Sequence, residues 1–241
     1  MSADDPSARA RRRLDEIRNA RDRVLVAPSI LSADFARLGE ESSEAAAAGA
    51  DLLHVDCMDG HFVPNLTIGP CVVQSLRRAT DLPLDVHLMI SDPGRYADAF
   101  LDAGADLLSF HVEAVRDPGP ILERIRARGA VPVLAVSPDT PIDRVHDHLD
   151  QVGMILVMTV HPGFAGQSFM EEVLPKVRSL RDRLGPDFLI EVDGGIGPKT
   201  VRAALDAGAN VLVAGSAVFG KRDRAAAIRE LRTATISQGV K

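Results

Sequence analysis

Four residues able to hold a metal ion close three short apolar runs of the chain: His54 and Asp56 in the first, His87 in the second and Asp193 in the third. Side chains two residues apart on a strand share a face, so His54 and Asp56 point the same way. Two imidazoles and two carboxylates suit zinc, iron, manganese or cobalt. A buried carboxylate without a partner is costly, and a bound cation relieves that cost. The pattern therefore favours a divalent metal site.

Each of these residues taken alone also has an ordinary structural explanation. A single His at the end of a buried strand is more often a hydrogen-bonded core residue, and a single Asp there often caps the next helix. Four such residues, on the inward face of three strand ends, favour a ligand set. Cys57 lies on the opposite face and Cys71 lies at a helix start, so neither is given a chemical role.

Three methionines, Met58, Met89 and Met158, end three of the apolar runs. Methionine is usually adaptable core filler. Three at one barrel mouth would also form a soft wall that excludes water beside a reactive carbon. The pattern leaves both interpretations open.

Three successive strand ends are rich in glycine. The chain reads His161-Pro-Gly-Phe-Ala-Gly-Gln-Ser168 after one run, Asp193-Gly-Gly-Ile-Gly197 after the next and Ala214-Gly-Ser-Ala217 after the last. Such turns expose backbone N–H groups that hold anions without a basic residue. Any single Gly-Gly is weak evidence because turns need glycine, but three consecutive strand ends of this kind favour a phosphate site.

Apolar runs of strand length alternate with amphipathic stretches from Val24 onward. The predicted strands are Val24–Ala27, Leu52–Val55, Leu84–Met89, Leu107–Val112, Val131–Val136, Met154–Val160, Phe188–Val192 and Val211–Val213. The predicted helices include Phe35–Ala48, Arg95–Ala103, Pro120–Arg128, Phe169–Leu184, Pro198–Ala207 and Arg222–Thr235. This alternation indicates right-handed βαβ units and a parallel sheet.

A fragment of the form Ala-Gly-Ala-Asp or Ala-Gly-Ala-Asn recurs at Ala48, Ala103 and Ala207. Its glycine is placed to end a helix, and an apolar strand follows at once. If the copies open strands 2, 4 and 8, each unit takes about 27 residues, which favours a (β/α)8 barrel. Periodicity alone leaves a doubly wound open sheet as the alternative. In a barrel, functional groups belong at the carboxyl ends of the strands.

Length and composition fit one large domain. The chain has 241 residues, of which 46% are hydrophobic and 26% are charged. Its two cysteines cannot form a disulfide scaffold, which favours a reducing compartment, and we expect the cytoplasm. The net charge of −6 argues against a general nucleic-acid binder. No apolar run approaches the roughly 18 residues of a membrane span, so no membrane partner is expected.

An arginine-rich segment precedes the first predicted strand. Residues 1–23 contain seven Arg against five acidic residues, and the acidic residues make the segment a poor transit peptide. We expect residues 1–23 to be an extension, either disordered or a loosely docked helix, and residues 24–241 to form the barrel domain.

A metal site, a phosphate site and two carboxylates together indicate chemistry on a phosphorylated sugar. A Lewis-acidic metal chelated by the sugar would stabilise an enediolate and make a carbon-bound proton removable. With Asp56 and Asp193 on opposite faces of that carbon, one removes the proton and the other returns one, which is epimerisation. No G-x-G-x-x-G follows a strand, so no dinucleotide cofactor is predicted.

At these residues the chain resembles the ribulose-phosphate 3-epimerase family, from Val26-Ala-Pro-Ser-Ile-Leu-Ser-Ala-Asp34 through Gly215-Ser216. The motifs that carry the resemblance are His54-Val-Asp-Cys-Met-Asp-Gly-His-Phe-Val-Pro-Asn65, Asp85-Val-His-Leu-Met89, Val157-Met-Thr-Val-His-Pro-Gly-Phe-Ala-Gly-Gln167 and Glu191-Val-Asp-Gly-Gly195. The resemblance implies an α/β fold, a single TIM barrel of the ribulose-phosphate-binding type. It also implies a homo-oligomeric isomerase of the pentose phosphate pathway that interconverts D-ribulose 5-phosphate and D-xylulose 5-phosphate.

The resemblance also implies roles for individual residues. One divalent metal ion, with Zn²⁺ favoured over Fe²⁺, Mn²⁺ or Co²⁺, would be held by His54, Asp56, His87 and Asp193, and Asp56 and Asp193 would be the catalytic acid/base pair. The substrate-binding residues that it implies are Ser29, Met58, His87, Met89, Met158, Gly163, Phe164, Ala165, Gly166, Gly194, Gly195, Gly215 and Ser216.

Two departures from the family pattern keep other substrates and functions in view. His161 replaces the usual Asn before Pro-Gly-Phe, and Ala165 replaces the usual Gly after that Phe, as in D-allulose 6-phosphate 3-epimerases. A barrel of the orotidine-phosphate decarboxylase type would place a Lys among its carboxylates, and no predicted strand from the first to the seventh ends in one. A non-catalytic phosphosugar-binding barrel would have no need to keep both Asp56 and Asp193.

Overall fold

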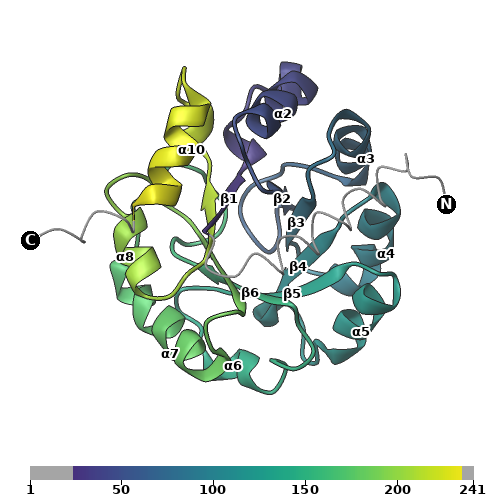
Figure 1. Ribbon diagram of the computed structural model, residues 1–241. Helices are drawn as coiled ribbons and strands as arrows, with labels where there is room; N and C mark the ends of the chain where they lie inside the picture. The colour runs from purple at the N-terminus through teal and green to yellow at the C-terminus, as the bar shows by residue number, and fades with distance from the viewer. Residues whose placement is uncertain (1–23, 235–241) are drawn as a thin grey trace, which may run out of the picture.

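A computed structural model describes residues 24–234 and arranges them as a ring of parallel strands inside a ring of helices (Figure 1). The strands are β1 (Leu25–Pro28), β2 (Leu53–Met58), β3 (Leu84–Met89), β4 (Leu107–His111), β5 (Val131–Val136), β6 (Met154–Met158), β7 (Leu189–Asp193) and β8 (Val211–Ala214). Their hydrogen-bonded order is β1-β8-β7-β6-β5-β4-β3-β2. A parallel bridge between Ser29 and His54 joins the two ends of the sheet. The predicted (β/α)8 barrel is confirmed.

The outer ring consists of α2 (Leu38–Ala47), α3 (Pro70–Ala79), α4 (Pro93–Ala103), α5 (Gly119–Ala127), α6 (Asp143–His146), α7 (Leu174–Leu184), α8 (Val201–Asp206), α9 (Ser216–Phe219) and α10 (Arg224–Thr233). Short 3-10 turns precede or follow several strands and helices: η1 (Ile30–Ser32), η2 (Phe35–Arg37), η3 (Val112–Ala114) and η4 (Glu171–Val173). Among the described residues, no helix is long and apolar enough to cross a membrane.

Two of the predicted helices are wrong in extent. The helix predicted over 35–48 is split because the Asp34 side chain accepts from Ala36 N and caps a 3-10 turn before α2 begins. The helix predicted over 169–184 begins only at Leu174. Pro175 occupies its first turn, where a missing N–H costs nothing.

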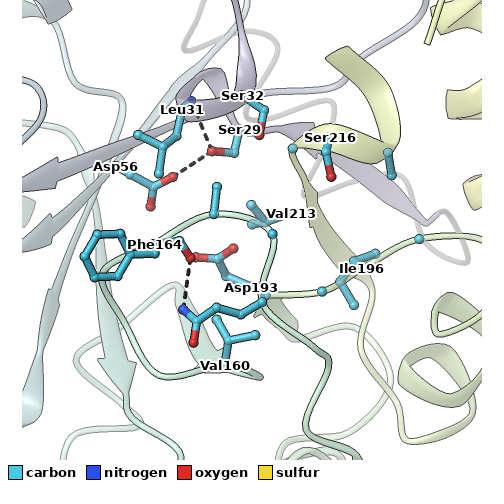
Figure 2. A pocket seen from close by; sticks show the side chains of 18 of the residues that line it. Ser29, Leu31, Ser32, Asp56, Val160, Phe164, Asp193, Ile196, Val213 and Ser216 are labelled. Atoms are coloured by element: carbon cyan, nitrogen blue, oxygen red, sulfur yellow. Dashed lines mark hydrogen bonds between the residues drawn. The ribbon is translucent and has the colours of Figure 1, made fainter. Parts of the chain in front are cut away.

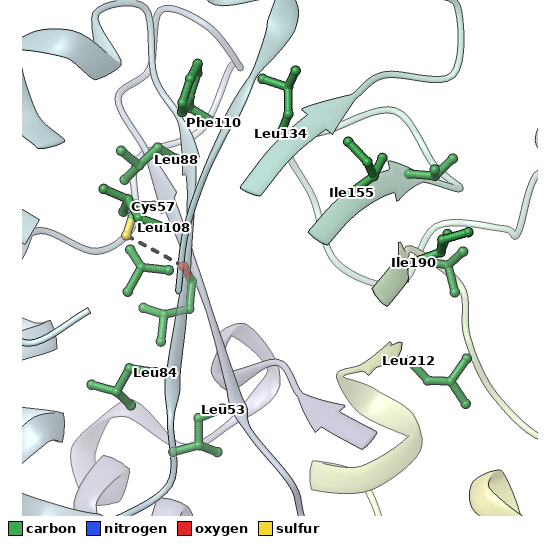
Figure 3. Close-up of a cluster of buried hydrophobic side chains, with 14 of the residues drawn as sticks. Leu53, Cys57, Leu84, Leu88, Leu108, Phe110, Leu134, Ile155, Ile190 and Leu212 are labelled. Carbon is green, nitrogen blue, oxygen red and sulfur yellow. Dashed lines mark hydrogen bonds between the residues drawn. The ribbon is translucent and has the colours of Figure 1, made fainter. Parts of the chain in front are cut away.

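Alternate side chains of each strand face the barrel interior and the helices, as expected for period-two strands. Leu25 and Ala27 pack inside the barrel. Cys57, Leu88 and Phe110 instead belong to the larger apolar layer between the strands and the helices (Figure 3). His54, Asp56 and Met58 have the parity opposite to Cys57, so they face inward. Residues 1–23, the predicted extension, lie outside the described residues.

Strand register brings distant parts of the sequence together at the carboxyl rim of the barrel. Asp56 of β2 is paired with His87 of β3, and Met158 of β6 is paired with Asp193 of β7. The rim therefore collects the ionisable residues that the sequence places at separate strand ends.

Candidate active site

The four predicted metal ligands converge at the rim. His54 Nε2 lies 3.3 Å from Asp56 Oδ1 and 3.7 Å from Asp193 Oδ2. His87 Nδ1 lies 3.4 Å and 3.8 Å from the same two oxygens. One donor atom from each residue falls within 4.8 Å of the others. Donors bound tetrahedrally at about 2.1 Å from one ion lie roughly 3.4 Å apart, so the spacing suits a single metal ion.

Two nitrogens in this cluster have no hydrogen-bond partner among residues 24–234. His54 Nε2 and His87 Nδ1 are buried and unpaired within the described part of the chain, and both face the two carboxylates. An unpaired buried polar atom is costly. A divalent cation among these residues would accept one lone pair from each imidazole, and the carboxylates would balance its charge. The donor set therefore fits a divalent transition metal.

The surroundings of Asp56 and Asp193 push the pKa values of the two carboxyl groups apart. Burial raises the pKa of Asp56, but the charge of the neighbouring His54 outweighs burial and holds that pKa well below its usual range. Ser29 Oγ also donates to Asp56 Oδ2 at 2.6 Å (Figure 2). Burial and then the neighbouring charge of Asp56 raise the pKa of Asp193 to about 7. One proton acceptor and one proton donor thus lie side by side.

Two further carboxyl groups lie behind His54. Asp85 Oδ2 is 2.6 Å from His54 Nδ1, and Glu191 Oε1 is 3.7 Å from the same nitrogen. Burial opposes a positive charge on His54, but Asp56 and Asp85 outweigh it and raise its pKa well above the usual value. Because Nδ1–H is held by Asp85, a metal ion would replace the proton on Nε2.

Two of the proposed ligands, Asp56 and Asp193, line a cavity of about 380 Å³ (Figure 2). Every predicted substrate-binding residue except His87 lines it: Ser29, Met58, Met89, Met158, Gly163, Phe164, Ala165, Gly166, Gly194, Gly195, Gly215 and Ser216. Met58 and Met89 are buried and cluster with Val63, so they serve both as core filler and as an apolar wall of the cavity. The substrate roles of these residues stay predictions.

The far end of the cavity is built from glycine loops. Gly194 has φ +123° and Gly195 has φ +66°, a region that favours glycine. A Cβ on Gly194 would lie 2.5 Å from Val160 Cγ2, and one on Gly195 would lie 2.6 Å from Phe169 N. This loop therefore has no room for side chains at these two positions, and loops of this kind can bind phosphate through backbone N–H groups.

Residues 25–219 match the family described as "Ribulose-phosphate 3 epimerase family". The chain belongs to this family. It is 50% identical over 213 residues to ribulose-phosphate 3-epimerase of Bacillus subtilis (strain 168), which covers 87% of this chain and 98% of that protein. It is 51% identical over 211 residues to the enzyme of that name from Mycobacterium tuberculosis (strain ATCC 25618 / H37Rv), covering 86% and 91%. The chain is thus an isomerase.

Solved structures with less sequence similarity share the fold alone. A 3-hexulose-6-phosphate synthase is 23% identical with a TM-score of 0.62, covering 88% of this chain and 99% of that one. Orotidine 5′-phosphate decarboxylase from Pyrococcus horikoshii OT3 is 15% identical with a TM-score of 0.65, covering 90% and 100%. They confirm the barrel architecture of this family member.

Several polar residues of the epimerase site were not singled out from the sequence. Asp85 and Glu191 lie two residues before His87 and Asp193, so strand alternation places them on the same inward face, but it assigns them no role. His111 ends β4 with inward parity and was detectable in the same way. Lys221, in the turn after α9, also lines the cavity, and no periodic pattern signals it.

Proposed function

We propose that the chain epimerises D-ribulose 5-phosphate to D-xylulose 5-phosphate at C3 with one divalent metal ion. The observation that carries the proposal is the pair of unpaired imidazole nitrogens, on His54 and His87, facing Asp56 and Asp193 within one cluster. Nitrogen and oxygen donors in this number suit Zn²⁺ best, and Fe²⁺, Mn²⁺ or Co²⁺ are compatible.

The two carboxyl groups are proposed to move the protons. When bound, the metal would act as a Lewis acid that polarises the substrate carbonyl and stabilises negative charge on its oxygen. One of Asp56 and Asp193 takes the C3 proton from one face, and the electron pair of the broken C–H bond forms the C2–C3 double bond of an enediolate. The other gives a proton to C3 from the opposite face, which inverts its configuration.

The rest of the cavity is proposed to hold and shield the substrate. Met58, Met89 and Met158 form an apolar wall that keeps solvent protons from the carbanionic carbon. The glycine end presents backbone N–H groups to the phosphate, and the ammonium group of Lys221 adds positive charge there.

The length of the substrate depends on the loop that carries the two family departures. Ala165 lines the cavity, whereas His161 is exposed and its Nδ1 lies 3.6 Å from Asp139 Oδ2. Ala165 in place of the usual Gly, as in D-allulose 6-phosphate 3-epimerases, favours a six-carbon ketose phosphate. We favour the pentulose because relatives about 50% identical to this chain are named ribulose-phosphate 3-epimerases.

The test is kcat/KM for D-ribulose 5-phosphate and D-allulose 6-phosphate on the protein as purified, after chelation, and after Zn²⁺ is restored. A higher value for the pentulose that disappears with chelator and returns with Zn²⁺ supports the proposal. A higher kcat/KM for the hexulose would contradict the proposal and support D-allulose 6-phosphate as the substrate. Binding of either sugar phosphate without turnover would indicate the non-catalytic alternative.

We also propose a homo-oligomer in the cytoplasm, with residues 1–23 as an extension outside the barrel. The family match begins at residue 25, and one plant relative is named a cytoplasmic isoform, whereas another is named chloroplastic. Light scattering gives the assembly state. Removal of residues 1–23 should leave turnover unchanged.

A further inference from the structure

A line of buried polar side chains leads away from the ligand His87. His87 Nε2 is 3.0 Å from His111 Nε2, and His111 Nδ1 is 3.1 Å from Glu113 Oε2. Both imidazoles are fully buried. On the far side, Ser137 N donates to Glu113 Oε1 at 2.8 Å, and Ser137 Oγ lies 3.2 Å from His111 Nδ1. His87 is thus linked to a carboxyl group through one intervening imidazole.

The hydrogen bond between the two rings decides what His87 can bind. Two imidazole nitrogens at this distance form a hydrogen bond only when one of them carries a proton. With the proton on His87 Nε2, the neutral ring has its lone pair on Nδ1, the atom that faces Asp56 and Asp193. With the proton on His111 Nε2, His87 carries its own proton on Nδ1 and cannot be a metal ligand.

Glu113 selects between these two states. Burial raises the pKa of Glu113, but the hydrogen bond with His111 outweighs it and lowers that pKa to about 2, so the residue is a carboxylate that only accepts. His111 Nδ1 must then carry the proton that it shares with Glu113. In the neutral ring, His111 Nε2 is then left as the acceptor, and the proton between the rings belongs to His87 Nε2.

We propose that Glu113 is a positioning residue that acts through His111 to set the tautomer of His87 and so frees His87 Nδ1 to bind the metal. The inference rests on the metal-dependent function proposed above. The tautomer of His54 is set directly by a carboxylate, because Asp85 accepts the hydrogen bond from its Nδ1–H. Carboxylates that fix ligand histidines in this way are common behind metal sites. Here the Glu113 carboxylate acts on His87 through the imidazole of His111.

Glu113→Gln tests the inference with almost no change of shape. Ser137 N–H would donate to the amide oxygen of the new side chain, so the amide NH₂ group would face His111 Nδ1. His111 would then carry its proton on Nε2, and His87 would carry one on Nδ1. We expect Zn²⁺ affinity, measured by competition with a chromogenic chelator, to fall about 10- to 100-fold. The absorption bands of bound Co²⁺ should weaken in parallel.

Two further variants separate tautomer control from loss of packing. Ser137→Ala removes the hydroxyl that contacts His111 Nδ1 but keeps Glu113, so Zn²⁺ affinity should stay at the wild-type value. His111→Gln in the Glu113→Gln background replaces the ring by an amide whose oxygen can accept from His87 whatever residue 113 is. Zn²⁺ affinity should therefore recover in that double variant.

Imidazole ¹⁵N NMR on the metal-free full chain reads the tautomers without any need for metal binding. We expect Nε2–H on His87 in the wild type and Nδ1–H in Glu113→Gln. An unchanged tautomer, or unchanged Zn²⁺ affinity in a wild type that binds Zn²⁺, overturns the relay. Failure of the wild type to bind Zn²⁺ overturns the proposed function instead, and the NMR comparison still decides the relay.

Discussion

The two ends of the cavity differ in what lines them: ionisable side chains at one end and glycine backbone at the other. The end formed by β2, β3 and β7 uses buried ionisable side chains, whose behaviour depends on where each proton lies. The end formed by the loops after β6, β7 and β8 uses glycine backbone, whose behaviour depends on φ and on the lack of a Cβ. Substitution at the first end should therefore change chemistry with the fold intact, and substitution at the second should change shape and phosphate binding.

The largest expected effect is at the side-chain end. Asp193→Asn removes a proposed proton-transfer group and should lower kcat by about 10³-fold or more. The metal-free variant should melt no lower than the wild type, because a carboxyl group strained by burial and by Asp56 has been removed. Steady-state kinetics and thermal unfolding check both points. The exposed carboxylate of Asp182 gives the control, Asp182→Asn, and near-normal turnover in Asp193→Asn would remove that residue from the mechanism.

The next effect is at the backbone end. Gly194→Ala adds a Cβ at φ +123° and 2.5 Å from Val160 Cγ2, so we expect about 3 kcal/mol of destabilisation and a higher KM. Gly197→Ala is the matched control in the same loop, because its Cβ would meet its nearest neighbour at 3.8 Å. Urea denaturation of both variants measures the difference. Equal stabilities would show that the glycine end tolerates side chains.

Metal binding should stabilise the folded chain by a smaller amount. A ligand at 100 times its dissociation constant adds about 2.7 kcal/mol to the free energy of unfolding. Melting temperatures with excess Zn²⁺ and after chelation should differ accordingly. The shift should shrink in Asp193→Asn, which lacks one donor, and persist in Gly197→Ala. A shift of equal size in the wild type and Asp193→Asn would place the bound ion elsewhere.

The smallest effect is expected from Lys221, the one cation that the described residues contribute to the cavity lining. Lys221→Met should raise KM about fivefold with kcat unchanged, since an exposed charge pair contributes roughly 1 kcal/mol. High salt should weaken the wild type more than the variant. The control is Lys199→Met, an exposed lysine outside the lining. A fall in kcat without a change in KM would assign Lys221 another role.

Much of this arrangement could be predicted because strands impose a strict period of two. His54 and Asp56 had to face inward once Cys57 faced the helices, and the recurring Ala-Gly-Ala fragment marked the barrel units. The same period places Asp85 and Glu191 on the inward face, although it gives neither residue a role.

Other features depend on contacts that no local pattern encodes. The meeting of His87 with His111 requires the register of β3 against β4, which pairs His87 with Ser109. Glu113 comes from the short 3-10 turn η3 after β4 and Ser137 from the loop after β5, and the paths of such connections follow neither the strand nor the helix period. The start of α7 was mispredicted because Met170 and Phe169 continue its apolar pattern before the helix begins. Lys221 reaches the cavity from the turn after α9, and no local pattern encodes that contact.

The central claim is metal-dependent proton exchange at C3 by two carboxyl groups, and proton NMR of D-ribulose 5-phosphate with the protein in D₂O tests it most directly. We predict that the C3 proton signal is lost through deuterium exchange while D-xylulose 5-phosphate appears. Chelation should stop both processes, and Zn²⁺ should restore them. Epimerisation that continues at full rate after chelation, or xylulose 5-phosphate formed with its C3 proton retained, would contradict the account.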